Sequence, residues 1–406
     1  MRILLITQLF DPENAIKGLS FAKSLVSLGH EVEVVTTFPS YPGGKIFTGY
    51  KMRWQQVEYL DGVRVVRVPS YISHGHTALK RFASYASFSL AALLYSLVGA
   101  KRADIVYSYY PPMVGGITGV LISLLKRSAL IYDVQDLWPE ALVAVGISEK
   151  SAGFKVIEKI MNWIYHRSTA IIVLSNGYKQ ALIKKGIPAD KIHRVYNWCD
   201  ESRMKVVEAS NYLNNKNTNK NFDILYAGNM GAAQALHFVI QAADKLQQMG
   251  RQDIRFIFLG NGIELENLKK QAASLKLSNV IFRGHVAPEL VGAELQAADT
   301  LLVHLASNPV FDITVPSKTQ AYLAAGKPIL MAVAGESAEI IKLANAGIVS
   351  LPCNPADIAA GAISMADASA EQLFAFATSA RKYYLNNMSQ MNGVEQISRI
   401  FLQTKS

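Results

Sequence analysis

Residues 314–330 carry a candidate anion-binding site, because a short helix is predicted to begin there just after a proline. Ser317 is the expected N-cap, since its hydroxyl can accept a hydrogen bond from the first free amides. Residues 318–325 have the length and alanine content of a short helix, and Gly326 provides its end. The start of such a helix leaves backbone N–H groups pointing outward, with the Lys318 ammonium beside them. This arrangement predicts a site for a phosphate-sized anion.

A second group of residues that could do chemistry is Asp136-Leu-Trp-Pro-Glu140. Pro139 stiffens the backbone just beyond a predicted strand, and ligand sites in α/β sheets form beyond strand ends. Asp136 and Glu140 could present carboxylates to hydroxyl groups of a substrate, one of them orienting the nucleophile and taking its proton. The structural alternative is a pair of charges near a helix start at Pro139.

Histidine and cysteine usage does not predict a metal site. Four histidines lack partners at metal-site spacing and are interpreted as structural: His166, His193, His237 and His304. The two cysteines, Cys199 and Cys353, fit a reducing compartment and offer no cluster. We therefore expect neither a metal nor another cofactor.

The first half of the chain has the α/β pattern needed to position such residues. A strand at 2–7, a polar loop at 11–18, a helix at 19–28 and a strand at 31–37 form a predicted βαβ unit. Further strands are predicted at 63–68, 104–109, 129–133 and 170–174, with a helix at 115–125. Ser175 is expected to cap a helix that ends at Gly186.

The pattern stops in residues 210–221, where six of twelve residues are asparagine, which predicts a solvated linker. It restarts with a strand at 222–227, the glycine turn Gly228-Asn-Met-Gly231 and a helix from about 233 to 249. Further strands are predicted at 255–259, 280–282, 300–305 and 329–333. The expected fold is α/β, with two tandem Rossmann-like domains. Lys318 would then lie in the second of these domains, where its anion would be a nucleotide diphosphate.

The predicted boundaries are 1–200 for an N-terminal domain, 201–222 for the linker and 223–380 for a C-terminal domain. Residues 381–406 are expected to form a C-terminal helix that could pack back on the N-terminal domain.

Positive charge is concentrated in the first half. Residues 1–200 carry 23 Lys and Arg against 14 Asp and Glu, a balance of +9, whereas residues 201–406 carry 18 against 17, a balance of +1. A basic first half indicates an anionic surface or substrate as its partner. Nucleic acid is not expected, because the sequence has no basic run with interleaved aromatics, zinc knuckle or helix-turn-helix pattern.

Residues 82–100 form nineteen residues without a charge, bracketed by Lys80-Arg81 and Lys101-Arg102. The length just reaches that of a membrane-spanning helix, but four serines, two tyrosines and a glycine make it a poor one. Two interpretations stay open. The segment is either a buried helix of the first domain or a monotopic helix whose basic flanks meet anionic lipid head groups.

Several motifs together carry a family resemblance that covers nearly the whole chain. They are Gly29-His-Glu-Val32, Asp136-Leu-Trp-Pro-Glu140, Ser175, Asn197-Trp-Cys-Asp200, Tyr226-Ala-Gly-Asn-Met-Gly231, Leu259-Gly-Asn-Gly262, Phe282-Arg-Gly-His-Val286 and Pro316-Ser-Lys318. In this order and spacing, the chain resembles the retaining glycosyltransferases of family 4, which have the two-domain GT-B architecture. It looks most like the WbuB-like L-fucosamine transferases of O-antigen and capsule synthesis.

The resemblance implies an active site in the cleft between the domains and a transfer that needs no metal, with positive side chains and helix-start amides meeting the departing diphosphate. It implies acceptor binding in the first domain and these donor-binding residues in the second: Gly228, Asn229, Gly231, Gln234, Gly260, Gly262, Arg283, His285, Ser317, Lys318, Thr319 and Gln320. The structural alternatives are glycines that only turn a strand into a helix and a surface arginine at Arg283.

The sequence departs from the family pattern in two places. The usual pair of glutamates eight positions apart aligns with Ile313 and Ala321, and neither is acidic. Asp312 and Gln320 are also eight apart and could replace the pair, but one position on a helix turns a side chain by about 100°. A basic residue usually found after the glycine turn is replaced by Gln234, and Lys318 could supply its charge.

The resulting hypothesis is a cytoplasmic glycosyltransferase, peripheral on the inner face of the cytoplasmic membrane. Residues 1–10 are too short an apolar run for a signal peptide. The enzyme would move an N-acetylated deoxyhexose from a UDP-linked nucleotide sugar to a polyprenyl-diphosphate-linked saccharide acceptor, with retention. Alternatives are a nucleotide-sugar epimerase, which would need acid/base residues near the donor sugar in both halves, and a non-catalytic subunit that has lost the glutamate pair.

Overall fold

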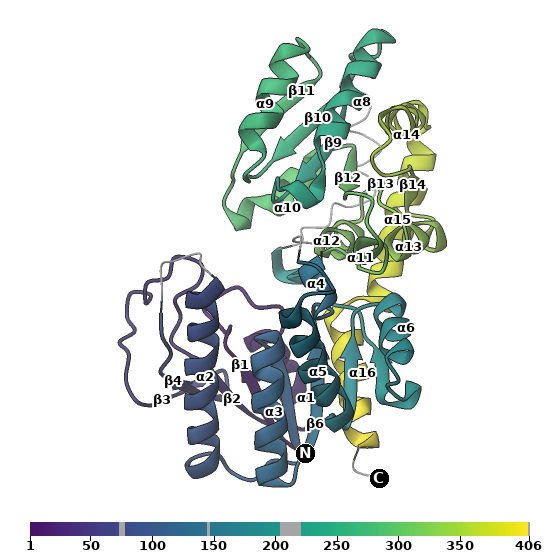
Figure 1. Ribbon diagram of the computed structural model, residues 1–406. Helices are drawn as coiled ribbons and strands as arrows, with labels where there is room; N and C mark the ends of the chain where they lie inside the picture. Colours follow the sequence, from purple (N-terminus) through teal and green to yellow (C-terminus); the bar gives the residue numbers. More distant parts are fainter. Residues whose placement is uncertain (73–77, 144–146, 204–220, 405–406) are drawn as a thin grey trace. The chain divides into compact units, whose positions relative to one another are not determined.

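The computed structural model describes residues 1–72, 78–143, 147–203 and 221–404. The chain forms two compact units, one of Met1–Tyr196 with Gln390–Ser406 and the other of Asn197–Ser389 (Figure 1). Most of the predicted asparagine-rich linker, residues 204–220, lies outside the described residues.

The first unit is built on an eight-stranded sheet in the order β3-β4-β2-β1-β5-β6-β7-β8. Its strands are β1 (Arg2–Thr7), β2 (Glu31–Thr37), β3 (Gln56–Leu60), β4 (Val63–Val68), β5 (Ile105–Tyr110), β6 (Ala129–Val134), β7 (Ala170–Val173) and β8 (Ile192–Arg194). All neighbours are parallel except β3 and β4, which form an antiparallel hairpin at the edge. The buried β-branched runs therefore form a parallel sheet, as predicted.

Helices cover both faces of this sheet. They are α1 (Leu19–Ser27), α2 (Ala78–Val98), α3 (Pro112–Lys126), α4 (Glu140–Val143), α5 (Ala152–Arg167), α6 (Asn176–Lys184) and α16 (Gln390–Gln403). Ser108 on β5 donates to the Gly115 carbonyl of α3 at 2.8 Å, whereas the next side chain back, Tyr107, stacks near Phe21 of α1 and Phe401 of α16. Since neighbouring strand residues point to opposite faces, α3 lies on one face and α1 with α16 on the other.

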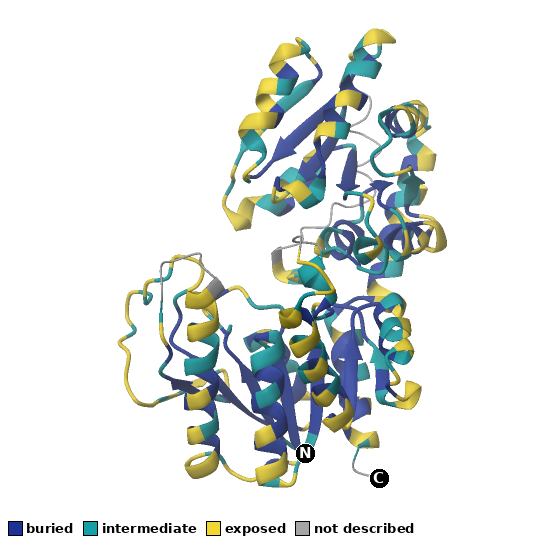
Figure 2. Ribbon diagram, in the orientation of Figure 1, coloured by how far each residue is buried: buried dark blue, intermediate teal, exposed yellow. Residues whose placement is uncertain are grey.

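The C-terminal helix α16 thus belongs to the first unit. His30, just before β2, makes a 2.7 Å contact between its Nε2 and the Ser398 hydroxyl of α16. Ser20 on α1 donates to the Gln390 side chain at 2.9 Å. Figure 2 shows buried strands beneath helices whose outer faces are exposed.

The second unit has a fully parallel six-stranded sheet in the order β11-β10-β9-β12-β13-β14. The strands are β9 (Phe222–Ala227), β10 (Ile254–Leu259), β11 (Val280–Gly284), β12 (Thr300–His304), β13 (Ile329–Ala332) and β14 (Gly347–Val349). The helices are α8 (His237–Gln248), α9 (Leu265–Ser274), α10 (Pro288–Ala297), α11 (Pro309–Asp312), α12 (Ser317–Ala325), α13 (Glu336–Ala344), α14 (Pro355–Asp367) and α15 (Ala370–Asn387). The prediction of a second Rossmann-like sheet is confirmed.

One predicted boundary is wrong for a local reason. The helix expected from about residue 233 begins at His237, after a separate 3₁₀ turn, Ala232–Gln234. Ala235 between them has φ +45, in the left-handed region. A non-glycine residue in that conformation cannot continue a right-handed helix, so the chain makes two pieces.

Candidate functional site

A pocket of about 260 Å³ opens at the carboxyl ends of β9 and β10, beside the start of α12. Its lining includes five residues expected from the sequence: Gly228, Gly260, His285, Ser317 and Lys318. Apolar side chains that were not predicted complete it: Val286, Pro288, Val291, Leu295 and Tyr322. The carboxyl ends of parallel strands are the usual place for a ligand in such a sheet.

Lys318 supplies the positive charge of this pocket. Its Nζ lies 4.8 Å from the centre of the Tyr226 ring, a cation–π distance. Loss of water around the ammonium lowers the pKa of Lys318 to about 8, because no carboxylate of the described residues replaces that water. A bound anion would stabilise the charged form.

The start of α12 differs from the prediction by one residue. Pro316 is the N-cap, and Ser317 is the first helical residue, whose hydroxyl makes no capping hydrogen bond. The predicted Ser317 cap is therefore wrong. Because the turn lacks a side-chain cap, the backbone N–H groups of Ser317 and Lys318 find no acceptor among the described residues. They remain available to an anion.

Two glycines hold the floor of the site together by close backbone packing. A Cβ on Gly260 would lie 2.1 Å from the Gly228 carbonyl oxygen, and one on Gly262 would lie 2.3 Å from the Met230 carbonyl oxygen. Gly228 has φ +134, and its added Cβ would lie 2.9 Å from the Lys318 Cε. These glycines therefore have a structural role, because an added Cβ would clash with its neighbours. At Gly228 the missing side chain also leaves room for Lys318.

The remaining glycine-turn residues brace the loop and do not line the pocket. The Gln234 Oε1 accepts from the Gly231 N–H at 2.9 Å and from the Asn229 side chain at 3.4 Å. The Gln234 carbonyl oxygen contacts the His304 Nδ1 at 2.7 Å. Both oxygens of Gln234, on its backbone carbonyl and on its side-chain amide, are therefore used in hydrogen bonds that hold the turn.

Arg283 lies within β11 rather than after a strand, and its guanidinium pairs with Glu294 of α10 at 2.6 Å. The Arg283 side chain is about 40% exposed, so this pair contributes little to stability. Arg283 is therefore a surface arginine in this structure. It could contact a phosphate only if its guanidinium left Glu294.

The described residues contain no group of three or more His, Cys, Asp and Glu side chains that could hold a metal ion. His304, one of the four histidines considered above, is buried, and burial lowers its pKa to about 4. It bridges the glycine turn to the Cys353 amide, which donates to its Nε2 at 3.3 Å.

In the first unit, Asp136 and Glu140 have different surroundings. Glu140 begins α4 and pairs with Lys185, just after α6, at 2.5 Å, so its charge is met inside the protein. Asp136 is an exposed residue that makes no ion pair or hydrogen bond with the described residues, and loss of water around its carboxyl raises its pKa. Asp136 is therefore the better candidate for a base.

Two family models match this chain. Residues 19–198 match the model described as "Glycosyl transferase 4-like domain", and residues 211–383 match "Glycosyl transferases group 1". WcaI of Escherichia coli (strain K12), named a colanic acid biosynthesis glycosyl transferase, is 27% identical over 312 residues, 74% of this chain and 75% of WcaI. WbjE of Pseudomonas aeruginosa, named a glycosyltransferase, is 25% identical over 261 residues, 64% of either chain.

The chain is a glycosyltransferase of the two-domain GT-B fold. A crystal structure of Anabaena HepE in complex with UDP and glucose has the same fold, with a TM-score of 0.67 over 99% of both chains and 16% identity.

Asp312 and Gln320, which could replace the family's glutamate pair, do not line the pocket beside α12. Gln320 is buried, and with its amide oriented by its neighbours it donates to the carbonyls of Pro316 at 2.7 Å and Ser317 at 3.1 Å. Ala321, one residue on, lines the pocket. Neither Asp312, at the end of α11, nor the buried Thr319 lines it.

A second pocket of this glycosyltransferase, about 350 Å³, lies in the first unit at the carboxyl ends of β1 and β2 and was not predicted. Glu13, Gln8 and Tyr110 are among its lining residues. Burial raises the pKa of Glu13, while N–H groups that donate to the carboxylate oppose this. No local motif marks Glu13, because its partners, Ser40 and Tyr41, lie 27 and 28 residues away.

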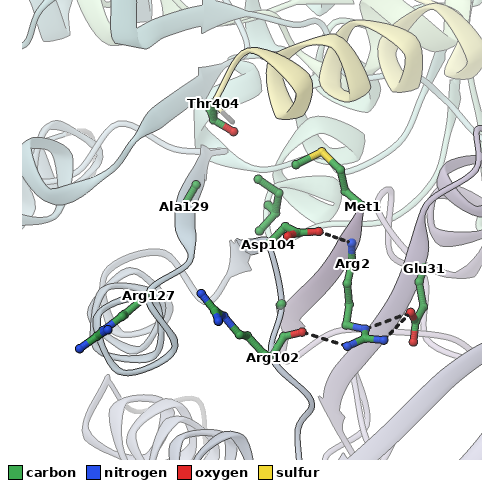
Figure 3. Close-up of a pocket in the computed structure, with 10 residues that line it drawn as sticks. Met1, Arg2, Glu31, Arg102, Asp104, Arg127, Ala129 and Thr404 are labelled. Carbon is green, nitrogen blue, oxygen red and sulfur yellow. Dashed lines mark hydrogen bonds and ion pairs between the residues drawn. The ribbon is translucent and has the colours of Figure 1, made fainter. Parts of the chain in front are cut away.

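Another cavity, about 720 Å³, lies at the amino-terminal ends of strands of the same sheet (Figure 3). Arg2, Arg102 and Arg127 line it, together with Glu31 and Asp104. Arg2 donates to Glu31 at 2.8 Å, and its backbone N–H donates to Asp104 at 2.9 Å. Since these charges meet each other at the amino-terminal ends of the strands, we assign this cavity no part in the transfer.

Proposed function

We propose that this glycosyltransferase moves a sugar from a UDP-linked nucleotide sugar to a polyprenyl-diphosphate-linked saccharide in surface polysaccharide synthesis, with retention of configuration. The observation that carries the proposal is Lys318, an ammonium that has lost much of its water and has no carboxylate partner among the described residues, beside two uncapped helix-start amides. These groups match a diphosphate in charge and in hydrogen-bond donors.

The nucleotide part of the donor is supported by the apolar wall of the same pocket. Val286, Val291 and Leu295 offer a surface for a base, and His285 offers a polar edge. HepE, which shares the fold, has been crystallised with UDP and with UDP-glucose. The relative WcaI is named for colanic acid biosynthesis, which supports a surface polysaccharide as the product.

In the proposed reaction the bond between the anomeric carbon and the diphosphate oxygen breaks, and the diphosphate keeps the electron pair. Lys318 and the amides of α12 stabilise the charge that develops on it. The acceptor oxygen forms the new bond to the anomeric carbon and passes its proton to Asp136. The donated sugar is proposed to be an N-acetylated deoxyhexose.

Transfer should not depend on a divalent metal, because protein groups meet the diphosphate charge. The test measures UDP release and glycosylated product from UDP-sugars and a lipid-linked saccharide, with and without excess EDTA. We expect the two rates to agree within about twofold. Loss of product with EDTA and its recovery with manganese would place a metal in the site and contradict this part of the proposal.

Membrane association is proposed through α2. One helix of the described residues, Leu79–Val98, is long and apolar enough to cross a membrane, yet only a third of its most apolar stretch is buried. Large apolar side chains recur along its outer face: Leu79, Phe82, Leu90, Leu94, Leu97 and Val98 are all exposed. A water-facing helix normally carries charges there, so this stripe fits the surface of a lipid layer better than water.

The interfacial position of α2 can be tested by changing Leu90, Leu94 and Leu97 together to glutamine. These side chains are exposed, and glutamine favours helix, so the fold should persist. Wild type should float with vesicles that contain anionic phospholipid, and the variant should remain in the soluble fraction. Three exposed apolar residues of the second unit, Met249, Ile263 and Leu343, provide the matched control. Equal flotation of the α2 variant and wild type would exclude this surface.

A further inference from the structure

The pocket at the carboxyl ends of β1 and β2 contains two buried oxygens that find no hydrogen-bond donor among the residues that the structure describes. They are the Glu13 Oε2 and the Gln8 Oε1, and these residues are 4% and 7% exposed. Leaving a buried acceptor unpaired costs about 1–3 kcal/mol, and more when the group is charged. A ligand for this pocket should therefore bring donors, as sugar hydroxyls do.

The Glu13 carboxylate is held in one orientation. Its Oε1 accepts from the backbone N–H groups of Ser40 and Tyr41, both at 2.7 Å. Its backbone N–H donates to the Phe10 carbonyl at 3.1 Å. With one oxygen fixed by two amides, the other is left for a partner from outside the protein.

Buried cations fix the loop that carries Glu13. The fully buried Arg67 donates to the Asp11 carbonyl at 2.5 Å and to the Thr37 carbonyl at 2.9 Å. Lys17, also fully buried, pairs with Asp133 at the end of β6. Such anchoring holds a binding side chain in place before the ligand arrives, so less ordering is needed on binding.

Tyrosines form a wall of the pocket, and cations stand at the start of α2. The hydroxyls of Tyr85 and Tyr110 are 2.8 Å apart, with their rings edge to face at 5.8 Å. Tyr41 is exposed beside them, and aromatic faces suit the C–H faces of a sugar. Lys80 and Arg81, both exposed, also line the pocket and would attract a phosphate.

We propose that this pocket binds the saccharide diphosphate of the acceptor, with a sugar hydroxyl on Glu13 and Gln8 and the diphosphate at Lys80 and Arg81. The inference rests on the proposed function and adds the acceptor site to it. The apolar stripe of α2 begins at the same place, since Leu79 and Phe82 flank the two cations and are exposed. A lipid chain on the diphosphate would continue along that stripe.

The test measures binding of octyl diphosphate and of octyl diphosphate esters of glucose, galactose and N-acetylglucosamine by calorimetry. Glu13→Gln keeps an oxygen for the two amides but replaces the free oxygen with a donor. We expect it to weaken binding of the best sugar diphosphate at least tenfold and to leave octyl diphosphate within twofold. The double variant of Lys80 and Arg81 to glutamine should weaken both ligands at least fivefold. These two side chains are exposed, so the substitutions should not disturb the fold.

Glu31→Gln is the matched control, because Glu31 is a carboxylate of the same unit that lies at the amino-terminal ends of the strands, away from this pocket. It should bind every probe as wild type does. Unchanged sugar-diphosphate binding in Glu13→Gln, or no binding of any probe to wild type, would overturn the acceptor site. UDP-sugar affinity, measured on the same samples, separates failure of the acceptor site from failure of the donor site. If UDP-sugar binding persists while the acceptor probes do not bind, the donor half of the proposed function stands.

Discussion

Asp136→Asn is expected to lower transfer by roughly 10²-fold or more, because it keeps the shape of the side chain and removes the base. Asp136 lacks a partner among the described residues, and loss of water around its carboxyl raises its pKa, which makes it a better proton acceptor than an ordinary aspartate. Donor affinity should stay within about twofold, since the donor pocket is built from the other unit. Initial rates and calorimetric UDP-sugar affinity are the measurements.

The pH profile gives a second measure of the same residue. The ionised carboxylate is the active form, so wild-type transfer should fall as pH drops through the raised pKa of Asp136. Transfer by the Asp136→Asn variant should not show this fall at low pH. Asp61→Asn is the control, because Asp61 is an exposed carboxylate that pairs with Lys23 at 2.7 Å in the same unit. Normal transfer in Asp136→Asn would make Asp136 a structural residue.

Lys318→Ala is expected to weaken UDP-sugar binding or transfer at least tenfold, about 1.4 kcal/mol or more. The ammonium is buried beside two free amides, so a bound diphosphate meets it in a site with little competing water. Lys327→Ala is the control, because Lys327 is a buried lysine of the same unit whose pKa is also lowered to about 8, but its ammonium donates to the Gln296 carbonyl at 3.1 Å outside the pocket.

The lowered pKa of Lys318 also predicts how donor affinity changes with pH. Above pH about 8 the free enzyme loses this charge, so UDP-sugar affinity should fall as pH rises through that value. Lys318→Arg keeps its charge and should flatten the profile. If affinity and turnover of Lys318→Ala both stay within twofold of wild type, another group must hold the diphosphate.

The sequence was sufficient to predict both sheets, because their central strands are continuous buried runs of Val, Ile and Leu. It missed β3, an edge strand in which no residue is buried and the apolar Val57 and Tyr59 are the exposed positions. It also missed β8 and β14, which have three residues each.

The candidate site was predicted less completely, because its details depend on pairs that are distant in the chain. Lys318 could be proposed from the sequence because the helix start and its lysine are adjacent in the chain. The partners of Glu140 and Glu13 lie 45 and 27 residues away and leave no local pattern. Gln320 illustrates the finer limit, since a single step along α12 separates its buried amide from Ala321 in the pocket.

The most direct test incubates the purified protein with a panel of UDP- and GDP-sugars and lipid-linked saccharides and analyses the products by mass spectrometry and NMR. We predict one donor, UDP-linked, that gives free UDP and an acceptor enlarged by one sugar, with the anomeric configuration of the donor kept. Release of a changed nucleotide sugar without transfer would indicate an epimerase instead. Transfer with inverted configuration, or no product from any pair, would contradict the proposed function.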